Sequence, residues 1–134
     1  MTIALDCDVI QADGGTRTAA ITGGWVALHD ALSVLAKTHG VAGPKHYLLG
    51  QVGAVSVGLV DGKTVVDLDY LNDSRAEVDM NVVMRRTGER TDFIEVQGTG
   101  EHGVFSRAQM DGLMDAATGA IAEIHAAQRA ALGI

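Results

Sequence analysis

The hydrophobic period changes three times along this chain, and each change limits the folds that the chain can adopt. Residues 2–9 alternate apolar and more polar side chains, the period of a strand with one buried face. Residues 17–38 repeat apolar side chains every three or four positions, and residues 52–99 return to alternation. A second helical pattern follows. The expected order is strand, helix, about four strands and helix, which indicates an α/β domain.

The first helical pattern is expected to run from Arg17 to about Thr38 and to end at Gly40, a residue typical of helix C-termini. Trp25 is interpreted as a core anchor within its apolar stripe. The stripe consists of Ile21, Trp25, Leu28, Leu32 and Leu35.

The strand segments are separated by recognisable turns. Asp61-Gly62 is a strong hairpin signal between strands expected at 52–60 and 63–68. Two further strands are expected at 77–84 and 92–99. One face of the strand at 77–84 is apolar and carries Val78, Met80, Val82 and Met84.

The C-terminal helix has a capping box, in which Ser106 is followed three residues later by Gln109. Apolar residues then fall on one helix face, which predicts packing against the sheet. The face consists of Met110, Leu113, Met114, Ala117, Ile121, Ile124 and Leu132.

Composition narrows the class of protein. The chain has 134 residues, 47% of them hydrophobic, enough for one domain with a real core. Its single cysteine, Cys7, cannot form an internal disulfide and fits a reducing cytoplasm. We expect no signal peptide and no membrane span, because no apolar run approaches about 20 residues. The net charge of −7, with Arg85, Arg86 and Arg90 the only local basic group, argues against RNA binding by this chain alone.

The turn before the first helix is a candidate phosphate site. Gly14 and Gly15 lead into the helix N-terminus, where backbone N–H groups and the positive end of the helix dipole meet. Thr16 adds a hydroxyl and Arg17 a forked cation, both suited to phosphate. The same residues are also ordinary turn and cap chemistry, so spacing alone leaves both interpretations open.

A cluster of carboxylates lies between the second and third expected strands. Asp67, Asp69, Asp73 and Asp79 fall within thirteen positions, and Asp67 and Asp69 are expected to share a strand face. Magnesium often binds through one or two carboxylates together with phosphate oxygens. Solvated loop aspartates are the alternative, except for Asp79, which lies among apolar strand residues. A metal role for the loop histidines His39 and His46 is a weaker possibility.

Several of these segments resemble ribonuclease PH, a phosphate-dependent exoribonuclease that trims the 3′ ends of transfer RNA precursors. The resemblance covers nearly the whole chain and implies an α/β fold of the ribonuclease PH type, partial here, with a mixed sheet and packed helices. It also implies that residues 1–40 are a remnant of the first unit of that fold and residues 41–134 its C-terminal unit. The similar segments are Asp13–Thr18, Asp67–Met84, Glu95–Thr99, Phe105–Arg107 and Gln128–Leu132.

The resemblance implies roles for individual residues. The family's phosphate-binding triplet falls on Gly15, Thr16 and Arg17, and its two active-site aspartates fall on Asp73 and Asp79. These aspartates are implied to hold Mg²⁺ or to assist proton transfer to the leaving oxygen. The implied reaction is phosphorolysis, in which inorganic phosphate releases nucleoside 5′-diphosphates from the RNA 3′ end.

The chain also departs from the family. Family members are much longer, which implies that an N-terminal half, with a further phosphate-binding arginine and the basic RNA-contacting residues, is absent. The loop 41–51 is longer than usual, and Asn72 stands where glutamate is common.

We therefore expect assembly and keep two alternative functions open. The expected partners are a transfer RNA 3′ end and either further copies, in a ring of six built from dimers, or a missing N-terminal half. The edge of the strand at 2–9 would need such a neighbour. The alternatives to catalysis are an inactive ring or scaffold module and, less favoured, a small phosphate-binding protein without a role on RNA.

Overall fold

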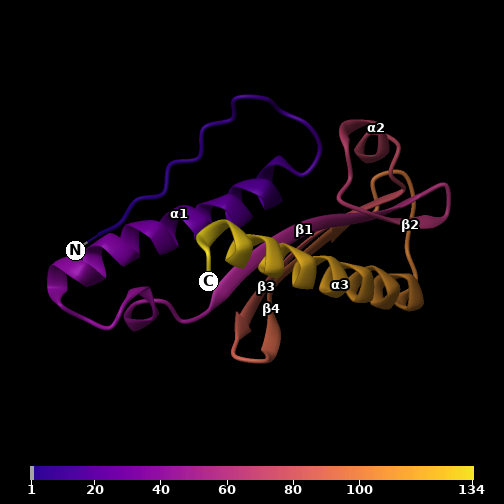
Figure 1. The fold of residues 1–134 in the computed structure, drawn as a ribbon. Helices are drawn as coiled ribbons and strands as arrows, with labels where there is room; N and C mark the ends of the chain where they lie inside the picture. The colour runs from indigo at the N-terminus through magenta and orange to yellow at the C-terminus, as the bar shows by residue number, and fades with distance from the viewer. Residues whose placement is uncertain (1) are drawn as a thin grey trace.

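A four-stranded sheet and two long helices form the framework of the computed structural model, which describes residues 2–134 (Figure 1). Neighbouring strands lie in the order β2-β1-β3-β4. The elements in chain order are α1 (Thr16–His39), η1 (Pro44–His46), β1 (Gln51–Val60), β2 (Lys63–Val66), α2 (Tyr70–Asp73), β3 (Val78–Thr87), β4 (Arg90–Thr99) and α3 (Arg107–Leu132).

The expected helices and hairpins are confirmed, with two differences in the sheet. Asp61 and Gly62 both have positive φ, 51° and 71°, as a two-residue hairpin turn requires. The expected mixed sheet is wrong for the described part of the chain, where β1 pairs antiparallel with β2 and β3, and β3 with β4. A register shift opposite Val83 and Met84 leaves Ile94 as an extra residue in β4.

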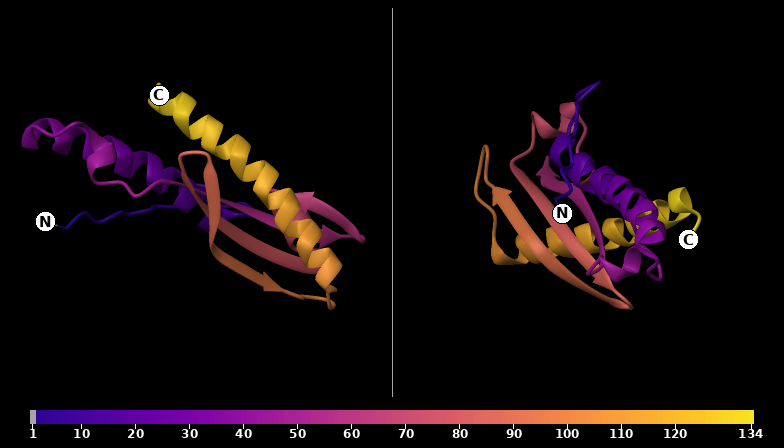
Figure 2. Two further views of the ribbon diagram at one scale, coloured as in Figure 1. Left: turned by 90° about the horizontal axis from the view of Figure 1, so that it is seen from below. Right: turned by 90° about the vertical axis from the view of Figure 1, so that its left-hand side faces the viewer.

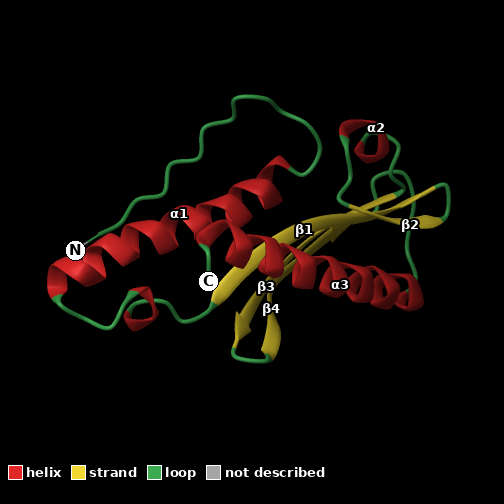
Figure 3. Cartoon of the chain, viewed as in Figure 1, coloured by secondary structure: helices red, strands yellow, loops and turns green. Residues whose placement is uncertain are grey.

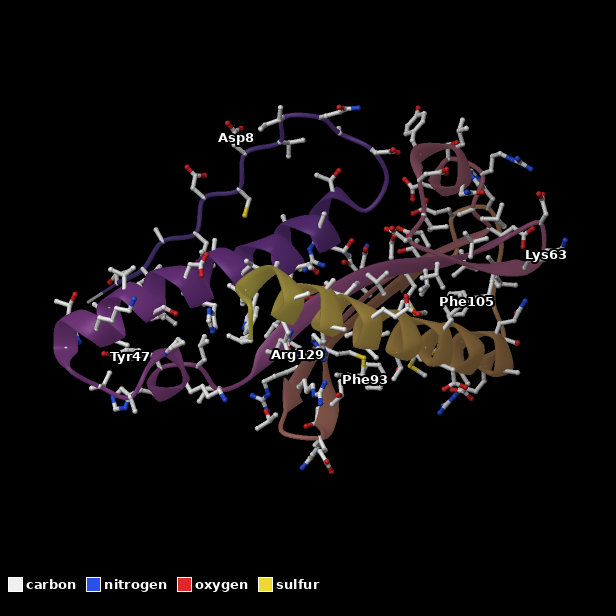
Figure 4. The ribbon with its side chains drawn as sticks, in the orientation of Figure 1. Asp8, Tyr47, Lys63, Phe93, Phe105 and Arg129 are labelled. Atoms are coloured by element: carbon white, nitrogen blue, oxygen red, sulfur yellow. The ribbon has the colours of Figure 1, made fainter. Side chains whose placement is uncertain are left out.

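The strand expected at residues 2–9 is not formed. This segment is exposed and runs as an extended loop beside α1 (Figure 3). Its apolar side faces the helix, because Leu5 and Cys7 approach Gly24 and the Cys7 thiol lies 3.9 Å from Ala20 O, whereas Asp8 points away from α1 (Figure 4). None of the four described strands pairs with it, so alternation alone does not produce a strand here.

The core lies between one face of the sheet and α3. The apolar faces predicted for β1, β3 and α3 meet there, and α3 crosses the sheet over them (Figure 2). The capping box of Ser106 and Gln109 is formed at the start of α3. Buried residues of this core are Val55, Val57, Leu59, Val78, Met80, Val82, Met84, Leu113, Ala117 and Ile121.

The buried stripe of α1 is rotated from the predicted one. Trp25 and Leu32 are buried as expected, but Ile21, Leu28 and Leu35 are only half-buried. The remaining buried positions of the helix are Thr18, His29 and Ala36. The reason is that α1 packs mainly against β1, and polar groups of the helix are needed at the edge of that strand.

That edge of β1 is closed by side chains instead of a strand. β2 pairs only with Val57–Val60, which leaves the earlier backbone groups on this edge without a strand partner. Three hydrogen bonds satisfy their carbonyl groups: from Trp25 Nε1 to Gly50 O (3.0 Å), from Gln128 Nε2 to Val52 O (2.8 Å) and from Thr22 Oγ1 to Ala54 O (3.2 Å). The N–H of Ala54 also donates to Thr22 Oγ1, at 3.1 Å. The two long helices are thereby attached to the same strand.

The expectation that no segment is long and apolar enough to cross a membrane needs correction. α1 meets that test over 24 residues, by length and composition only, with a mean hydropathy of 1.3 in its most apolar window. Core helices of soluble proteins pass the same test, and α1 packs mainly against β1, with Trp25 and Leu32 buried. The helix is therefore weak support for a membrane role.

Candidate functional site

The glycine turn lies at the start of α1, as predicted. Gly15 has φ 70° and ψ 20°, a left-handed conformation that favours glycine, and no side chain among the described residues caps this helix end. Backbone N–H groups of the first helical turn therefore point toward any anion placed there. Thr16 Oγ1 donates to Asp13 O at 2.9 Å, so the hydroxyl must turn its single proton away from Asp13 before it can donate to an anion.

This turn packs directly against the acidic segment. A Cβ atom at Gly14 would overlap the carbonyl oxygen of Leu68, so only glycine allows this approach. Asp13 Oδ1 accepts from the N–H of Tyr70 at 2.7 Å and from that of Gly14 at 2.7 Å. These two hydrogen bonds lower the pKa of Asp13, because they favour its ionised form. The carboxylate ties the turn to the start of α2.

Asp67 and Asp69 do not share a strand face, which corrects the sequence prediction. β2 ends at Val66, and Asp67 takes a left-handed conformation with φ 58°. Asp69 is instead the N-cap of α2, where its Oδ1 accepts from Asn72 N at 2.8 Å. Both lie in the connection between β2 and α2, and Asp69 caps α2, a short helix in a segment that was expected to be a loop.

Asp73 and Asp79 form the close acidic pair. Asp73 ends α2, and Asp79 is the second residue of β3, on the face opposite α3. Burial raises the pKa of Asp79, and the negative charges of Asp73 and Glu101 raise it further, against a hydrogen bond from Met80 N. The charge of Asp73 is thus felt at Asp79, so a cation or a proton held between them would relieve repulsion.

The phosphate candidates and the acidic pair share one face of the sheet. Arg17 reaches across this face to Glu95 of β4, with Nη2 at 2.9 Å from Oε1 and 3.0 Å from Oε2. Glu95 is opposite Val83 of β3, and Asp79 lies on the same face four residues along that strand, roughly 13 Å at a rise of about 3.3 Å per residue. The fold therefore brings the two motifs to one face of the sheet, where Glu95 of β4 lies beside the strand that carries Asp79.

Sequence reasoning missed two residues that take part in the candidate site, Asp13 and Glu95. Asp13 opens the glycine motif, yet its hydrogen bond to Tyr70 is 57 positions away and has no local signal. Glu95 lies in a segment that resembles ribonuclease PH, which marks it as worth attention without indicating that Arg17 is its partner.

The described residues contain no group of three or more His, Cys, Asp or Glu side chains arranged for a metal ion. His39 is instead engaged with Tyr47, at 2.9 Å between Nδ1 and the hydroxyl. Asp73 and Asp79 still fit magnesium, since this ion usually takes one or two carboxylates and completes its shell with water and phosphate oxygens.

Comparison with known proteins defines the class. A model of the 3′ exoribonuclease family, domain 2, matches residues 50–120. The chain belongs to this family of 3′ exoribonucleases. A solved structure of rice (Oryza sativa) Rrp46 has the same fold, with a TM-score of 0.68 at 17% identity over 93% of this chain and 51% of that one.

Within the family, the chain corresponds to the C-terminal half of ribonuclease PH, which confirms the resemblance. It is 59% identical to the ribonuclease PH of Corynebacterium glutamicum over 133 residues, which are 99% of this chain and 52% of that protein. The ribonuclease PH of Mycobacterium tuberculosis is 55% identical over 133 residues, 99% of this chain and 50% of that protein. The chain spans about half the length of the curated relatives it matches.

Proposed function

We propose that this chain is the catalytic half of a phosphorolytic 3′→5′ exoribonuclease, a nucleotidyltransferase that trims transfer RNA 3′ ends and releases nucleoside 5′-diphosphates. The observation that carries the proposal is the convergence of the Gly15–Arg17 turn and the Asp73–Asp79 pair on one sheet face. Half-length similarity to ribonuclease PH supports the reaction class.

The Gly15–Arg17 end of the site offsets the repulsion between inorganic phosphate and the phosphodiester that it attacks. Gly15, Thr16 and Arg17 bind inorganic phosphate through first-turn N–H groups, the Arg17 guanidinium and the Thr16 hydroxyl, whose proton turns from Asp13 O to the phosphate. They offset its charge and aim one oxygen at the terminal phosphodiester. A phosphate oxygen forms the new bond to phosphorus as the bond to the 3′ oxygen of the preceding nucleotide breaks.

The acidic end of the site serves the leaving oxygen. We assign Asp79 to proton transfer to the departing 3′ oxygen, because burial and the charge of Asp73 raise its pKa and so favour uptake of the proton that it passes on. Alternatively, Asp73 and Asp79, both ionised, would hold Mg²⁺, which when bound supplies Lewis-acid stabilisation of phosphate oxygens.

The partners follow from charge and length. A chain with a net charge of −7 lacks the cationic surface that RNA needs, so another polypeptide supplies it. We place residues 1–40 with the first unit of the fold and 41–134 in the second. The partner is a further copy, in a ring of dimers, or a polypeptide equivalent to the N-terminal half, in the cytoplasm and without a membrane. Only the second can supply the cationic surface, because a further copy carries the same net charge of −7. An inactive scaffold module is the second candidate, favoured by the same charge.

The test is nucleoside diphosphate release from a short RNA, with and without inorganic phosphate and magnesium. Arg17→Ala should lower the phosphate-dependent rate about 100-fold and raise the phosphate requirement, the effect of losing a preorganised charged donor. Arg107→Ala, an exposed arginine at the start of α3, is the matched control and should leave both unchanged. Unchanged phosphate dependence in Arg17→Ala rules out the proposed phosphate site. If no assembled form of the chain releases nucleoside diphosphate, the inactive scaffold module is favoured.

A further inference from the structure

The guanidinium of Arg17 is already paired with an anion, the carboxylate of Glu95. Nη2 of Arg17 lies within 3.0 Å of both carboxylate oxygens, although the two residues are 78 positions apart in the chain. Carboxylate and phosphate offer arginine the same kind of charged oxygen acceptor. The carboxylate therefore occupies the Nη2 donors, which a phosphate held across the guanidinium fork also needs, and the two anions compete for them.

This ion pair is placed where exchange is easy. The side chains of Arg17 and Glu95 are 50% and 39% exposed, so a dissolved anion can reach them. Exposed ion pairs contribute little stability, because solvent screens them and two long side chains must be held still. Inorganic phosphate carries more negative charge than one carboxylate at neutral pH and can also use the N–H groups of the first α1 turn.

The backbone position of Glu95 keeps its charge in the site after exchange. Glu95 belongs to β4, which pairs with β3 at Val83, on the face that also holds Asp79. Its carboxylate cannot leave this face without breaking the sheet register, so it continues to repel a phosphate bound at Arg17. Both the lost ion pair and this repulsion lower the affinity of the site for phosphate.

We propose that Glu95 sets the phosphate affinity of this site: its carboxylate holds Arg17 while phosphate is absent, and inorganic phosphate binds by replacing it. This inference rests on the proposed function, because it concerns the same arginine. Glu95 is then a specificity-determining residue. A ligand must carry more negative charge than a carboxylate in order to replace it at Arg17.

The experiment is a calorimetric titration of inorganic phosphate into the full chain, which measures the dissociation constant of phosphate. Glu95→Gln keeps the side-chain shape and removes the charge, and should bind phosphate about two- to fivefold more tightly, the fold-change expected for removal of one exposed ion pair. Glu123→Gln, on the exposed surface of α3, makes the same change in net charge and should bind as the unchanged chain does. Circular dichroism of each variant verifies folding, and Glu95→Ala serves as a second variant.

The arginine variants separate the inference from the proposed function. Arg17→Ala should lose phosphate binding, and Arg17→Ala with Glu95→Gln should show no gain over Arg17→Ala alone. Equal or weaker binding by both Glu95 variants overturns the inference, since Glu95 would then position Arg17 for phosphate without competing, while the phosphate site survives. Undiminished binding by Arg17→Ala overturns the phosphate site itself.

Discussion

The two faces of the sheet are built from the same strands and differ in almost every physical respect. The face under α3 is filled by aliphatic side chains that are nearly inaccessible to solvent. The opposite face carries Asp79, Asn81 and Glu95, all only partly buried, and is reached by Arg17 from α1. β3 contributes to both, since its side chains alternate between the faces.

The difference shows how stability and chemistry are divided in this domain. Burial of apolar surface beneath α3 supplies the stability. The polar face holds acids near one another, which costs stability because like charges repel and partial burial disfavours ionised groups. One face can be changed to test folding and the other to test binding.

Ile121→Ala tests the apolar face and should have the largest effect. Ile121 is fully buried against the sheet, so truncation removes apolar contacts and leaves a cavity, at a cost of about 2–5 kcal/mol in the free energy of unfolding. Chemical denaturation measures the change. Ile10→Ala, at a position 99% exposed, is the matched control and should change little. A similar small effect at both positions would contradict the assignment of the core.

Gln128→Ala tests the connection between the faces at the edge of β1. Gln128 is buried, donates to Thr22 O and Val52 O, and accepts from Gln51 Nε2. Its truncation leaves buried polar groups unpaired, which should cost about 1–3 kcal/mol by thermal or chemical unfolding. The exposed Gln11→Ala change should be nearly neutral. Equal stability of the two variants would mean that the hydrogen bonds of Gln128 contribute nothing to the stability of the fold.

His125 should make the apolar face sensitive to acid. Burial lowers the pKa of His125 below its usual 6.5, and the charges of Arg86 and Arg129 lower it further. The unfolded chain therefore binds a proton that the folded chain excludes, and stability is lost as pH falls below about 6.5. We expect a loss of about 1 kcal/mol or less between pH 7.5 and 5.5, and His125→Gln should flatten this slope. An unchanged slope would contradict the prediction.

Asp79→Asn should stabilise the polar face slightly. Because the pKa of Asp79 is raised on folding, its ionised form carries a penalty at neutral pH, which disappears as pH falls toward 3.8. Removing the charge should gain a few tenths of a kcal/mol at pH 7, discounted for solvent screening, and less in acid. Asp115→Asn, at an exposed position of α3, is the control and should change the stability little. A stability loss in Asp79→Asn would show that its carboxylate is needed structurally.

Sequence periodicity predicted the helices and strands well, because their patterns are local. The Asp61-Gly62 turn, the Ser106 capping box and the apolar alternation of β3 all involve neighbours within a few residues. The segment 2–9 behaves differently. It alternates as a strand does, but a strand also needs a partner for its backbone groups, and pattern carries no information about that partner.

The sequence by itself determined the elements, the apolar face that α3 covers, and the glycine turn and aspartates as candidates. Only the tertiary structure decided that Arg17 meets Glu95, that Asp13 ties the turn to α2, and that side chains close the edge of β1. The physical reason is range. Helix and strand preferences arise between residues a few positions apart, whereas these contacts join residues 25 to 78 positions apart and depend on how the finished elements pack.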